Sequence, residues 1–331
     1  MQYEERRTKK ATSALWITEA FRAELKEGPE PALNEGDILV RTQWSGISRG
    51  TERLVFEGRV PATETGRMRA PMQEGCFPFP VKYGYCAVGV VEQGPPNLLG
   101  RSVFALHPHQ DRFAIPSGLA APVPEGIPPR RAVLAANVET ALNAIWDGRC
   151  GPGDRIVVVG GGMVGLLTAH LAARIPGTEV TLVDLDPRCR AFTEHLGASF
   201  AGPDDTPSDA DIVFHTSASA EGLSTALACA GFEAQIIEMS WYGSGAVDAP
   251  LGGAFHSQRL QLVSSQVGHV PASRRARWTT ARRLATAMRL LDDQLLDVLV
   301  AEEVPFSALP EALPDILRGD ARGIPPVIAY Y

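Results

Sequence analysis

A glycine-rich turn at residues 160–165 limits the possible folds more than any other feature of the chain. It reads Gly-Gly-Gly-Met-Val-Gly, which matches the G-x-G-x-x-G pattern, and it directly follows the apolar run of residues 156–159. An apolar segment with helical character begins at Val164. A strand, a turn with these glycines and a helix, in this order, are typical of a dinucleotide-binding βαβ unit. We therefore predict an α/β fold that contains a Rossmann domain.

Each residue of this turn has a separate physical task. Gly160 permits the tight turn, Gly162 lets the backbone approach a pyrophosphate, and Gly165 lets the helix pack closely on the strand. The first helical residues, Met163 and Val164, present free N–H groups and the positive end of the helix dipole to the phosphates. These five residues are predicted to bind the cofactor. The alternative is a glycine-rich turn that binds nothing.

An acidic residue at the end of the next predicted strand indicates which dinucleotide is bound. Asp184 directly follows the predicted strand of residues 179–183. Its separation from Gly165 in the sequence is close to that expected for a ribose-binding carboxylate. A carboxylate there accepts hydrogen bonds from ribose hydroxyls and repels a 2′-phosphate, which favours NAD(H) over NADP(H). Arg188 is also predicted to lie at the cofactor, and it leaves a 2′-phosphate open as an alternative.

Strand-like and helix-like segments alternate from residue 155 onward, which predicts a parallel sheet. The carboxyl ends of such strands line the cofactor cleft, so Ser217 and Trp241 are predicted to contact the cofactor. His215 precedes Ser217, and a hydrogen-bonded structural histidine is the favoured interpretation there. The strands are expected at residues 155–159, 179–183, 211–214, 235–239 and 260–264, and the helices at 164–174, 188–196, 221–230 and 274–291.

The first part of the chain has a different pattern, with short apolar strands separated by glycine and proline. It predicts an irregular β-rich domain of roughly 120 residues, followed by a helix over residues 130–146. The last segment, from residue 305, predicts a helix and then a short strand. The strands of the first part are expected at residues 38–42, 85–91, 103–105 and 113–115.

Composition narrows the function classes. The chain has 331 residues, a net charge of −7 and a pI near 5.6, so it lacks the basic surface typical of nucleic-acid binders. The first ten residues are charged and have no apolar core, which predicts no signal peptide, and no apolar run is long enough for a membrane span. Five cysteines without C-x-x-C spacing indicate reduced thiols and a cytoplasmic location.

The order of the segments and four short motifs resemble the medium-chain dehydrogenase/reductase superfamily. The motifs are Gly46-Ile47-Ser48, Lys82 to Gly89, Glu139 to Leu142, and Gly153-Asp154-Arg155 before the glycine turn. The resemblance covers nearly the whole chain. It implies a GroES-like catalytic domain at residues 1–128 and 279–331, a Rossmann NAD(H)-binding domain at residues 129–278, and a homodimer joined near residues 260–267.

The zinc ligands of that superfamily are replaced in this chain. Ser48, Tyr85 and Glu139 stand where zinc members have Cys, His and a Cys or Glu, and only Glu139 is a good zinc ligand. Cys86 is a neighbour of Tyr85, and strand neighbours point to opposite faces. We therefore predict no metal. His107 is close to another histidine, but two histidines alone do not make a zinc site.

Without zinc, a hydrogen-bond donor must stabilise the charge that develops on a carbonyl oxygen during reduction. Tyr85 is the predicted donor, or the acceptor of the alcohol proton if its surroundings lower its pKa. Ser48 and Thr51 are predicted to relay that proton, and Glu139 to orient Tyr85 or bind a substrate hydroxyl. The alternatives are a packed aromatic residue, a turn-stabilising pair and a helix-surface carboxylate.

These observations predict a zinc-independent, NAD(H)-dependent oxidoreductase that interconverts a secondary alcohol and a ketone on a small, ring-bearing metabolite. Residues 45–54 also resemble the corresponding stretch of bacteriochlorophyllide hydroxyethyl dehydrogenases, which supports this reaction type. The alternatives are an NAD(P)H-dependent quinone or enoyl reductase and a non-catalytic NAD(H)-binding protein. Residues 52–76 are expected to form a loop over the cleft that selects the substrate. The arginines of residues 274–283 are interpreted as a solvated face.

Overall fold

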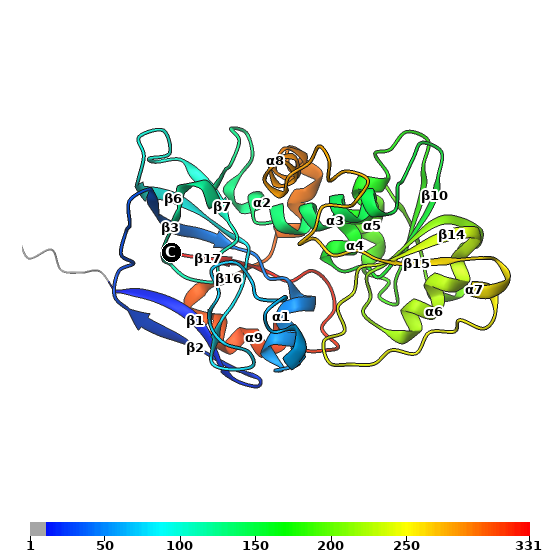
Figure 1. Ribbon diagram of the computed structural model, residues 1–331, viewed down its shortest axis with the longest axis horizontal. Coiled ribbons are helices and arrows are strands. Elements are labelled where there is room, and N and C mark those ends of the chain that lie inside the picture. Colours follow the sequence, from blue (N-terminus) through cyan, green and yellow to red (C-terminus); the bar gives the residue numbers. More distant parts are fainter. Residues whose placement is uncertain (1–10) are drawn as a thin grey trace, which may run out of the picture.

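The computed structural model describes residues 11–331, and Figure 1 shows them as two lobes lying side by side along the long axis. The lobe at the left of the view holds the N-terminal strands and the C-terminus, and the lobe at the right holds the glycine turn. The charged N-terminal ten residues, on which the signal-peptide prediction depends, lie outside the described residues. In the part of the chain that the structure describes, no helix is long and apolar enough to cross a membrane.

The right-hand lobe is built on one six-stranded parallel sheet, which confirms the predicted α/β fold. The strand β10 carries the glycine turn at its carboxyl end and lies in the middle of the sheet. The strands, in spatial order, are β12 (Ser199–Ala201), β11 (Glu179–Val183), β10 (Arg155–Val159), β13 (Ala210–His215), β14 (Ala230–Glu238) and β15 (Gln261–Ser264). Because β15 is at the end of this order, one of its edges has no partner among the described residues.

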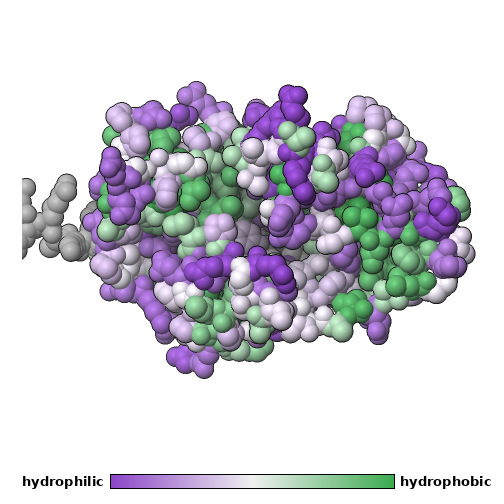
Figure 2. All heavy atoms as spheres, viewed as in Figure 1, coloured by the Kyte–Doolittle hydropathy of each residue, from purple (hydrophilic) through white to green (hydrophobic). Residues whose placement is uncertain are grey.

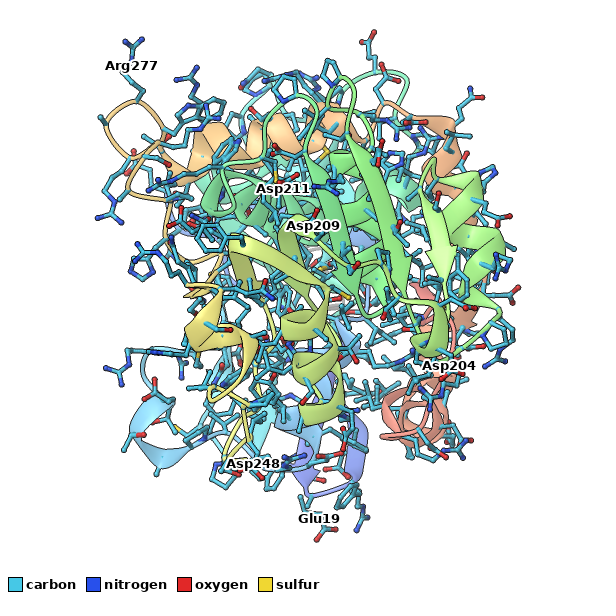
Figure 3. The ribbon with its side chains drawn as sticks, turned by 90° about the vertical axis from the view of Figure 1, so that its right-hand side faces the viewer. Glu19, Asp204, Asp209, Asp211, Asp248 and Arg277 are labelled. Atoms are coloured by element: carbon cyan, nitrogen blue, oxygen red, sulfur yellow. The ribbon has the colours of Figure 1, made fainter. Side chains whose placement is uncertain are left out.

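Helices cover both faces of this sheet, and apolar residues fill the layers between them. The predicted helices of this lobe are all present, although their ends differ by a few residues. They are α3 (Ala135–Asp147), α4 (Met163–Ala172), α5 (Cys189–His195), α6 (Ala220–Cys229) and α8 (Thr280–Leu290), with short helices α2 (Pro129–Ala132) and α7 (Ala254–Ser257). Asp209 and Asp211 lie near each other at the start of β13, where both contact Arg155 (Figure 3).

The left-hand lobe contains a seven-stranded sheet, in which six strands form one path, and a separate four-stranded sheet. The path runs β16 (Glu303–Pro305), β17 (Val327–Ala329), β3 (Asp37–Ser45), β6 (Ala87–Gln93), β7 (Ser102–Ala105) and β9 (Ala121–Pro122), and β8 (Arg112–Pro116) also pairs with β3. The other sheet runs β2 (Arg22–Gly28), β1 (Thr12–Glu19), β5 (Val81–Lys82) and β4 (Glu74–Gly75). Because β17 pairs with β3 and β16 pairs with β17, the C-terminal segment returns to the N-terminal lobe, and the helix α9 (Leu309–Leu317) lies between β16 and β17 in the sequence.

Two predictions about local structure are wrong. Residues 49–56 form the helix α1 (Arg49–Phe56) and not the start of a loop. Its amphipathic pattern was hidden in a polar sequence: Leu54, Val55 and Phe56 are buried, and Glu52 in the first turn accepts a hydrogen bond from the Ser48 backbone N–H at 2.7 Å. Glu52 therefore caps the helix.

The second concerns the predicted helix of residues 274–291, which begins only at Thr280. The Thr279 hydroxyl caps α8 by accepting a hydrogen bond from the Arg282 backbone N–H at 3.1 Å, so the preceding arginines lie in turns. Arg277 extends away from the molecule (Figure 3), and hydrophilic side chains gather over α8 in the space-filling view (Figure 2). The predicted domain boundary at residue 279 separates α8 from α3, although α8 packs on α3.

Candidate active site

The glycine turn has the geometry that a bound dinucleotide needs. Gly160 has a φ of 113°, and a Cβ atom there would lie 2.7 Å from the backbone nitrogen of Ser217. A Cβ atom on Gly165 would lie 1.9 Å from the carbonyl oxygen of Gly160. By contrast, a Cβ atom on Gly162 would meet nothing within 4 Å, so open space lies above the turn where a pyrophosphate would approach. Met163 and Val164 begin α4 directly after it.

Asp184 lies beside this turn and helps to hold it. Its carboxylate accepts hydrogen bonds from the backbone N–H groups of Gly161 at 2.5 Å and Asp186 at 2.7 Å. Arg188, which was also predicted to lie at the cofactor, forms an ion pair with Asp186 at 2.8 Å. Because that carboxylate already neutralises the guanidinium, Arg188 is less suited to a 2′-phosphate than the sequence pattern indicated. The residues present at this turn therefore fit a dinucleotide.

Three of the predicted catalytic residues lie together in the left-hand lobe. Tyr85 lies in the irregular stretch before β6, and the Ser48 and Thr51 hydroxyl groups at the start of α1 are close enough to its hydroxyl to influence its pKa. Burial is the main cause that raises the pKa of Tyr85, and the hydrogen bonds from the two hydroxyl groups oppose the shift only in part. The condition under which Tyr85 would accept the alcohol proton, a pKa lowered by its surroundings, is therefore not met. Tyr85 stays protonated at neutral pH.

A buried network that the sequence did not reveal supports this cluster. Glu52 contacts His109 at 3.0 Å through its second carboxylate oxygen, and the other ring nitrogen of His109 lies 2.8 Å from the Ser45 hydroxyl. Ser45 lies 2.9 Å from the Tyr330 hydroxyl in the C-terminal segment. A Cβ atom on Gly84 would meet the His109 ring at 2.8 Å, so this glycine lets the chain pass close to the ring. The network fixes α1 and, with it, Ser48 and Thr51.

Glu139 lies in a different environment from the other three residues. It is buried on α3 and forms an ion pair with Arg283 of α8, with 3.0 Å between Nε and Oε1. Burial raises its pKa, and the charge of Arg283 opposes the shift. Arg283 also donates hydrogen bonds to the Asn143 side chain and the Val267 carbonyl oxygen. Among the described residues, no contact joins Glu139 to Tyr85, and this carboxylate is not on a helix surface.

The residues at the zinc-ligand positions do not fit a zinc ion. Serine and tyrosine hydroxyl groups are not the Cys, His or carboxylate donors that protein zinc sites use. Cys86 is buried, with its sulfur 3.8 Å from Asn137 Oδ1, and burial holds the pKa of this thiol well above its ordinary value. Within residues 11–331, no group of three His, Cys, Asp or Glu side chains is placed to hold a metal.

The strand ends of the right-hand lobe carry a second polar network. His215 ends β13, and its Nε2 and Nδ1 atoms lie 2.7 Å from Ser217 Oγ and 2.7 Å from Glu238 Oε2, respectively. The Tyr242 hydroxyl donates to the same Glu238 oxygen at 3.0 Å. The sequence indicated His215, Ser217 and Trp241, but it gave no sign of Glu238 or Tyr242 as their partners.

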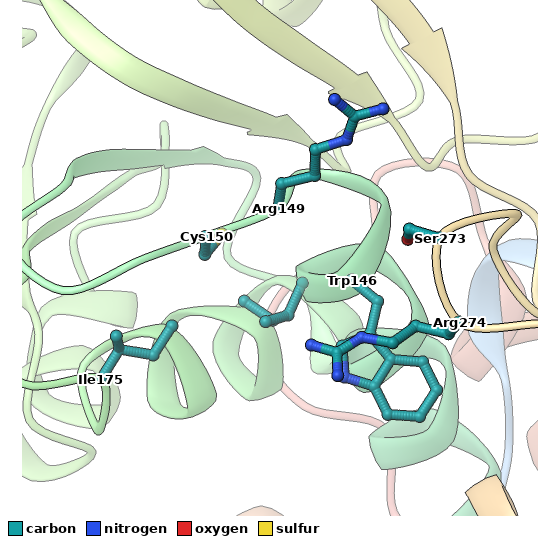
Figure 4. A pocket seen from close by; sticks show the side chains of 7 residues that line it. Trp146, Arg149, Cys150, Ile175, Ser273 and Arg274 are labelled. Atoms are coloured by element: carbon teal, nitrogen blue, oxygen red, sulfur yellow. The ribbon is translucent and has the colours of Figure 1, made fainter. Parts of the chain in front are cut away.

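Two cavities differ in their relation to these groups. One of about 220 Å³ lies between the lobes and is lined by Arg53 and Arg59 from one side and Ala218, Trp241 and Tyr242 from the other. A second, of about 530 Å³, lies at the C-terminal end of α3, where the Arg274 guanidinium stacks on the Trp146 indole (Figure 4). Cofactor clefts in such sheets form at the carboxyl ends of the strands. The smaller cavity is therefore the one that belongs to the cofactor cleft.

Comparisons with known proteins agree with this architecture. No family model matches the chain. D-guloside 3-dehydrogenase of Escherichia coli K12 is 24% identical over 322 residues, which cover 88% of this chain and 91% of the relative. L-idonate 5-dehydrogenase of E. coli K-12 superposes with a TM-score of 0.79 at 15% identity, over 97% of this chain and 99% of the other. A dehydrogenase of Sinorhizobium meliloti 1021, described as zinc-binding and solved with NADP, gives a TM-score of 0.78 at 16% identity over 97% and 99%.

The chain has the two-domain fold of the medium-chain dehydrogenases/reductases, with a Rossmann domain and a GroES-like domain, as the sequence resemblance indicated. The relatives and structural neighbours described above are dehydrogenases. D-guloside 3-dehydrogenase and L-idonate 5-dehydrogenase act on alcohol groups, so dehydrogenation of an alcohol is the reaction class to test.

Proposed function

We propose that this protein is an NAD(H)-dependent, zinc-independent dehydrogenase that interconverts a secondary alcohol and a ketone on a ring-bearing metabolite. The observation that carries the proposal is the cluster of Tyr85, Ser48 and Thr51 at the positions of the missing zinc ligands, in a lobe that faces a dinucleotide-binding turn. The relative named for oxidation at carbon 3 of a guloside supports a sugar ring as the ring-bearing part of the substrate.

The proposed cofactor is NAD(H). Gly160, Gly162 and Gly165 with the first residues of α4 would hold its pyrophosphate, and Asp184 would hold the adenosine ribose. The carboxylate of Asp184 and the neutralised Arg188 support NAD(H) over NADP(H). Bound there, the nicotinamide would accept or deliver a hydride.

In the reducing direction, the Tyr85 hydroxyl donates a hydrogen bond, and then a proton, to the ketone oxygen. Because the single Tyr85 proton is donated to the ketone, Ser48 and Thr51 donate hydrogen bonds to the Tyr85 oxygen. They stabilise the tyrosinate that forms and relay a proton from water back to it. The raised pKa of Tyr85 keeps its hydroxyl protonated at neutral pH, as a donor requires, but makes it a weaker acid, so transfer of the proton depends on stabilisation of the tyrosinate by Ser48 and Thr51. Glu52 and His109 hold the two hydroxyl groups in place through α1. Glu139 is not required for these steps.

We also propose a homodimer in the cytoplasm. The strand β15 lies at an edge of the parallel sheet, and Leu262 in it is 40% exposed. Phe232 in the neighbouring strand β14 is 68% exposed, and apolar residues gather at this end of the molecule in Figure 2. Pairing of β15 with its copy would cover an unpaired strand edge and part of this apolar surface.

Substitution of Tyr85 by Phe tests the chemistry. We expect turnover to fall by roughly 10²- to 10⁴-fold, because the substitution removes the proton donor and leaves the ring in place. NADH binding should stay unchanged. The measurement follows NADH formation with secondary alcohols, sugars and glycosides, on protein whose metal content has been quantified. Unchanged turnover would remove Tyr85 from the mechanism.

The same screen separates the two alternatives. Reduction of quinones or enoyl substrates with NADPH, in the absence of alcohol oxidation, would identify a C=C reductase. Tight NADH binding without turnover of any substrate class would favour a non-catalytic role. Asp184 argues against an NADPH-dependent C=C reductase, and the hydroxyl groups around Tyr85 argue against a non-catalytic role.

A further inference from the structure

Two hydrogen bonds link the Glu238 carboxylate, the His215 imidazole and the Ser217 hydroxyl in a chain. His215 Nδ1 lies 2.7 Å from Glu238 Oε2, and His215 Nε2 lies 2.7 Å from Ser217 Oγ. His215 is fully buried, whereas Ser217 is exposed. This carboxylate–imidazole pair is buried, but the hydroxyl to which it is hydrogen-bonded is exposed. The hydrogen-bond chain therefore ends at a group that a ligand can contact.

The surrounding backbone is shaped for this contact. A Cβ atom on Gly222, in the first turn of α6, would lie 2.0 Å from Ser217 Oγ and 2.9 Å from His215 Nε2. Any other residue would displace the hydroxyl or the ring. Ala218 has a φ of 53°, and its backbone N–H donates to the Ser240 hydroxyl at 3.1 Å. Non-glycine residues rarely adopt this conformation, and such strain commonly occurs at functional sites.

The chemistry of the three groups determines which of them donates and which accepts in each hydrogen bond. A carboxylate only accepts hydrogen bonds, so the Glu238 side requires a proton on Nδ1 of His215. In the neutral ring, Nε2 then has a free lone pair and must accept from Ser217. The Ser219 hydroxyl, 3.1 Å from Ser217 Oγ, already accepts from the Gly222 N–H and is free to donate to Ser217. One lone pair of Ser217 is left for a ligand.

The position of Ser217 indicates which half of the dinucleotide it faces. Asp184 follows β11, on one side of the glycine turn, and Ser217 follows β13, on the other side. A dinucleotide lies across the turn in such a sheet, with its adenosine half toward the first side. Ser217 therefore faces the second nucleoside of the cofactor, where the donors are ribose hydroxyl groups and the carboxamide.

We propose that the Glu238–His215 pair is a positioning device that commits the Ser217 hydroxyl to accept a hydrogen bond from the nicotinamide–ribose half of the cofactor. This inference rests on the proposed function, because it presumes that a nicotinamide dinucleotide binds at the glycine turn. Ser217 touches the cofactor, and His215 and Glu238 act only through it. The device selects a hydroxyl or amide N–H donor and disfavours an anionic group at the same position.

Binding measurements with three probes test the proposal without turnover. ADP-ribose carries both ribose groups, AMP carries only the adenosine half, and NADH is the complete cofactor. Ser217→Ala should weaken ADP-ribose and NADH binding by about 3- to 10-fold, the range of one net hydrogen bond, and change AMP binding by less than about twofold. Ser224→Ala is the matched control, because it removes a similar helix hydroxyl from the far side of α6.

A double-mutant cycle tests whether Glu238 acts through Ser217. Glu238→Gln should weaken ADP-ribose binding in the wild-type background and have no further effect in the Ser217→Ala background. His215→Gln retains an acceptor for Ser217 and a donor for Glu238, so it should restore most of the affinity that His215→Leu loses. AMP binding and the unfolding temperature identify any variant that fails to fold.

The outcomes separate this inference from the proposed function. If wild-type protein binds neither AMP nor NADH, the cofactor proposal fails and this inference fails with it. If NADH binds and Ser217→Ala leaves the binding of both NADH and ADP-ribose unchanged, only the inference is overturned, whereas a loss for NADH alone would assign the donor to the carboxamide. Additive losses for Glu238→Gln and Ser217→Ala would also overturn it, since they would show that the acid does not act through the serine.

Discussion

Replacing Arg283 with Met tests whether the buried pair with Glu139 holds the right-hand lobe together. Arg283 is 2% exposed, and it donates to three acceptors on two other segments: the Glu139 carboxylate, the Asn143 side chain and the Val267 carbonyl oxygen. Methionine keeps much of the apolar stem and removes every donor. The substitution therefore isolates the loss of the polar contacts from the loss of packing.

The expected loss of stability follows from the Glu139 carboxylate, which stays buried without its partner. Breaking a buried ion pair by removing one partner costs about 3–5 kcal/mol, because the remaining charge is left uncompensated. The entropy of unfolding is about 2.1 cal/mol/K per residue, so a chain of 331 residues loses about 4–7 °C of unfolding temperature for that change. Thermal unfolding followed by circular dichroism, with urea unfolding as a second measurement, gives both quantities.

Two further variants make this result interpretable. Arg289→Met, on the same helix, removes an exposed guanidinium that contacts only the Thr286 hydroxyl among the described residues, and it should cost less than about 1 kcal/mol. Glu139→Leu combined with Arg283→Met should recover most of the lost stability, because no charge then stays buried. Equal stability of the Arg283→Met and Arg289→Met proteins would refute the reasoning.

Three other predictions follow from single positions. Gly165→Ala should lower both the unfolding temperature and NADH affinity, because its Cβ would lie 1.9 Å from a backbone oxygen, whereas Gly162→Ala should weaken only NADH binding; calorimetry and fluorescence titration check both. Burial lowers the pKa of His107 to about 3 from 6.5, so the unfolded chain binds more protons between these values and stability should fall as the pH falls through this window, by up to about 1.4 kcal/mol per pH unit. His107→Gln should flatten that slope in urea unfolding, and an unchanged slope would contradict the assignment. Shortening residues 57–65 should change substrate preference far more than NADH affinity, and equal losses of both would count against a substrate-selecting loop.

The parallel half of the fold is predictable because its signals are local. The glycine turn, the apolar strands around it and Asp184 all lie within one βαβ unit, and β10 and β11 have the predicted bounds. The helix α1 was missed because its apolar face contains only a few residues and its cap comes from Glu52, a residue within the polar stretch. The start of α8 was placed too early because arginines are good helix formers, and the capping role of Thr279 decided the outcome.

The site was predictable only where one segment supplies all of its parts. Ser48 and Thr51 lie on the same turn, and Tyr85 was found through a motif, but the groups that orient them come from distant segments. Glu52 and His109 are 57 residues apart in the sequence, and Ser45 and Tyr330 are 285 apart. No spacing rule connects such pairs, because the contacts depend on how β3, α1 and the C-terminal segment fold together.

Each lobe contains a carboxylate, an imidazole and a serine in line, and exposure distinguishes what the two chains do. In the left-hand lobe, Glu52, His109 and Ser45 are all buried, so every hydrogen bond is used within the protein and the chain is a structural support. In the right-hand lobe, the chain of Glu238 and His215 ends on the exposed Ser217, and the last lone pair of this hydroxyl has no partner among the described residues. The same chemistry therefore fixes a helix in one lobe and presents a hydrogen-bond acceptor to a ligand in the other.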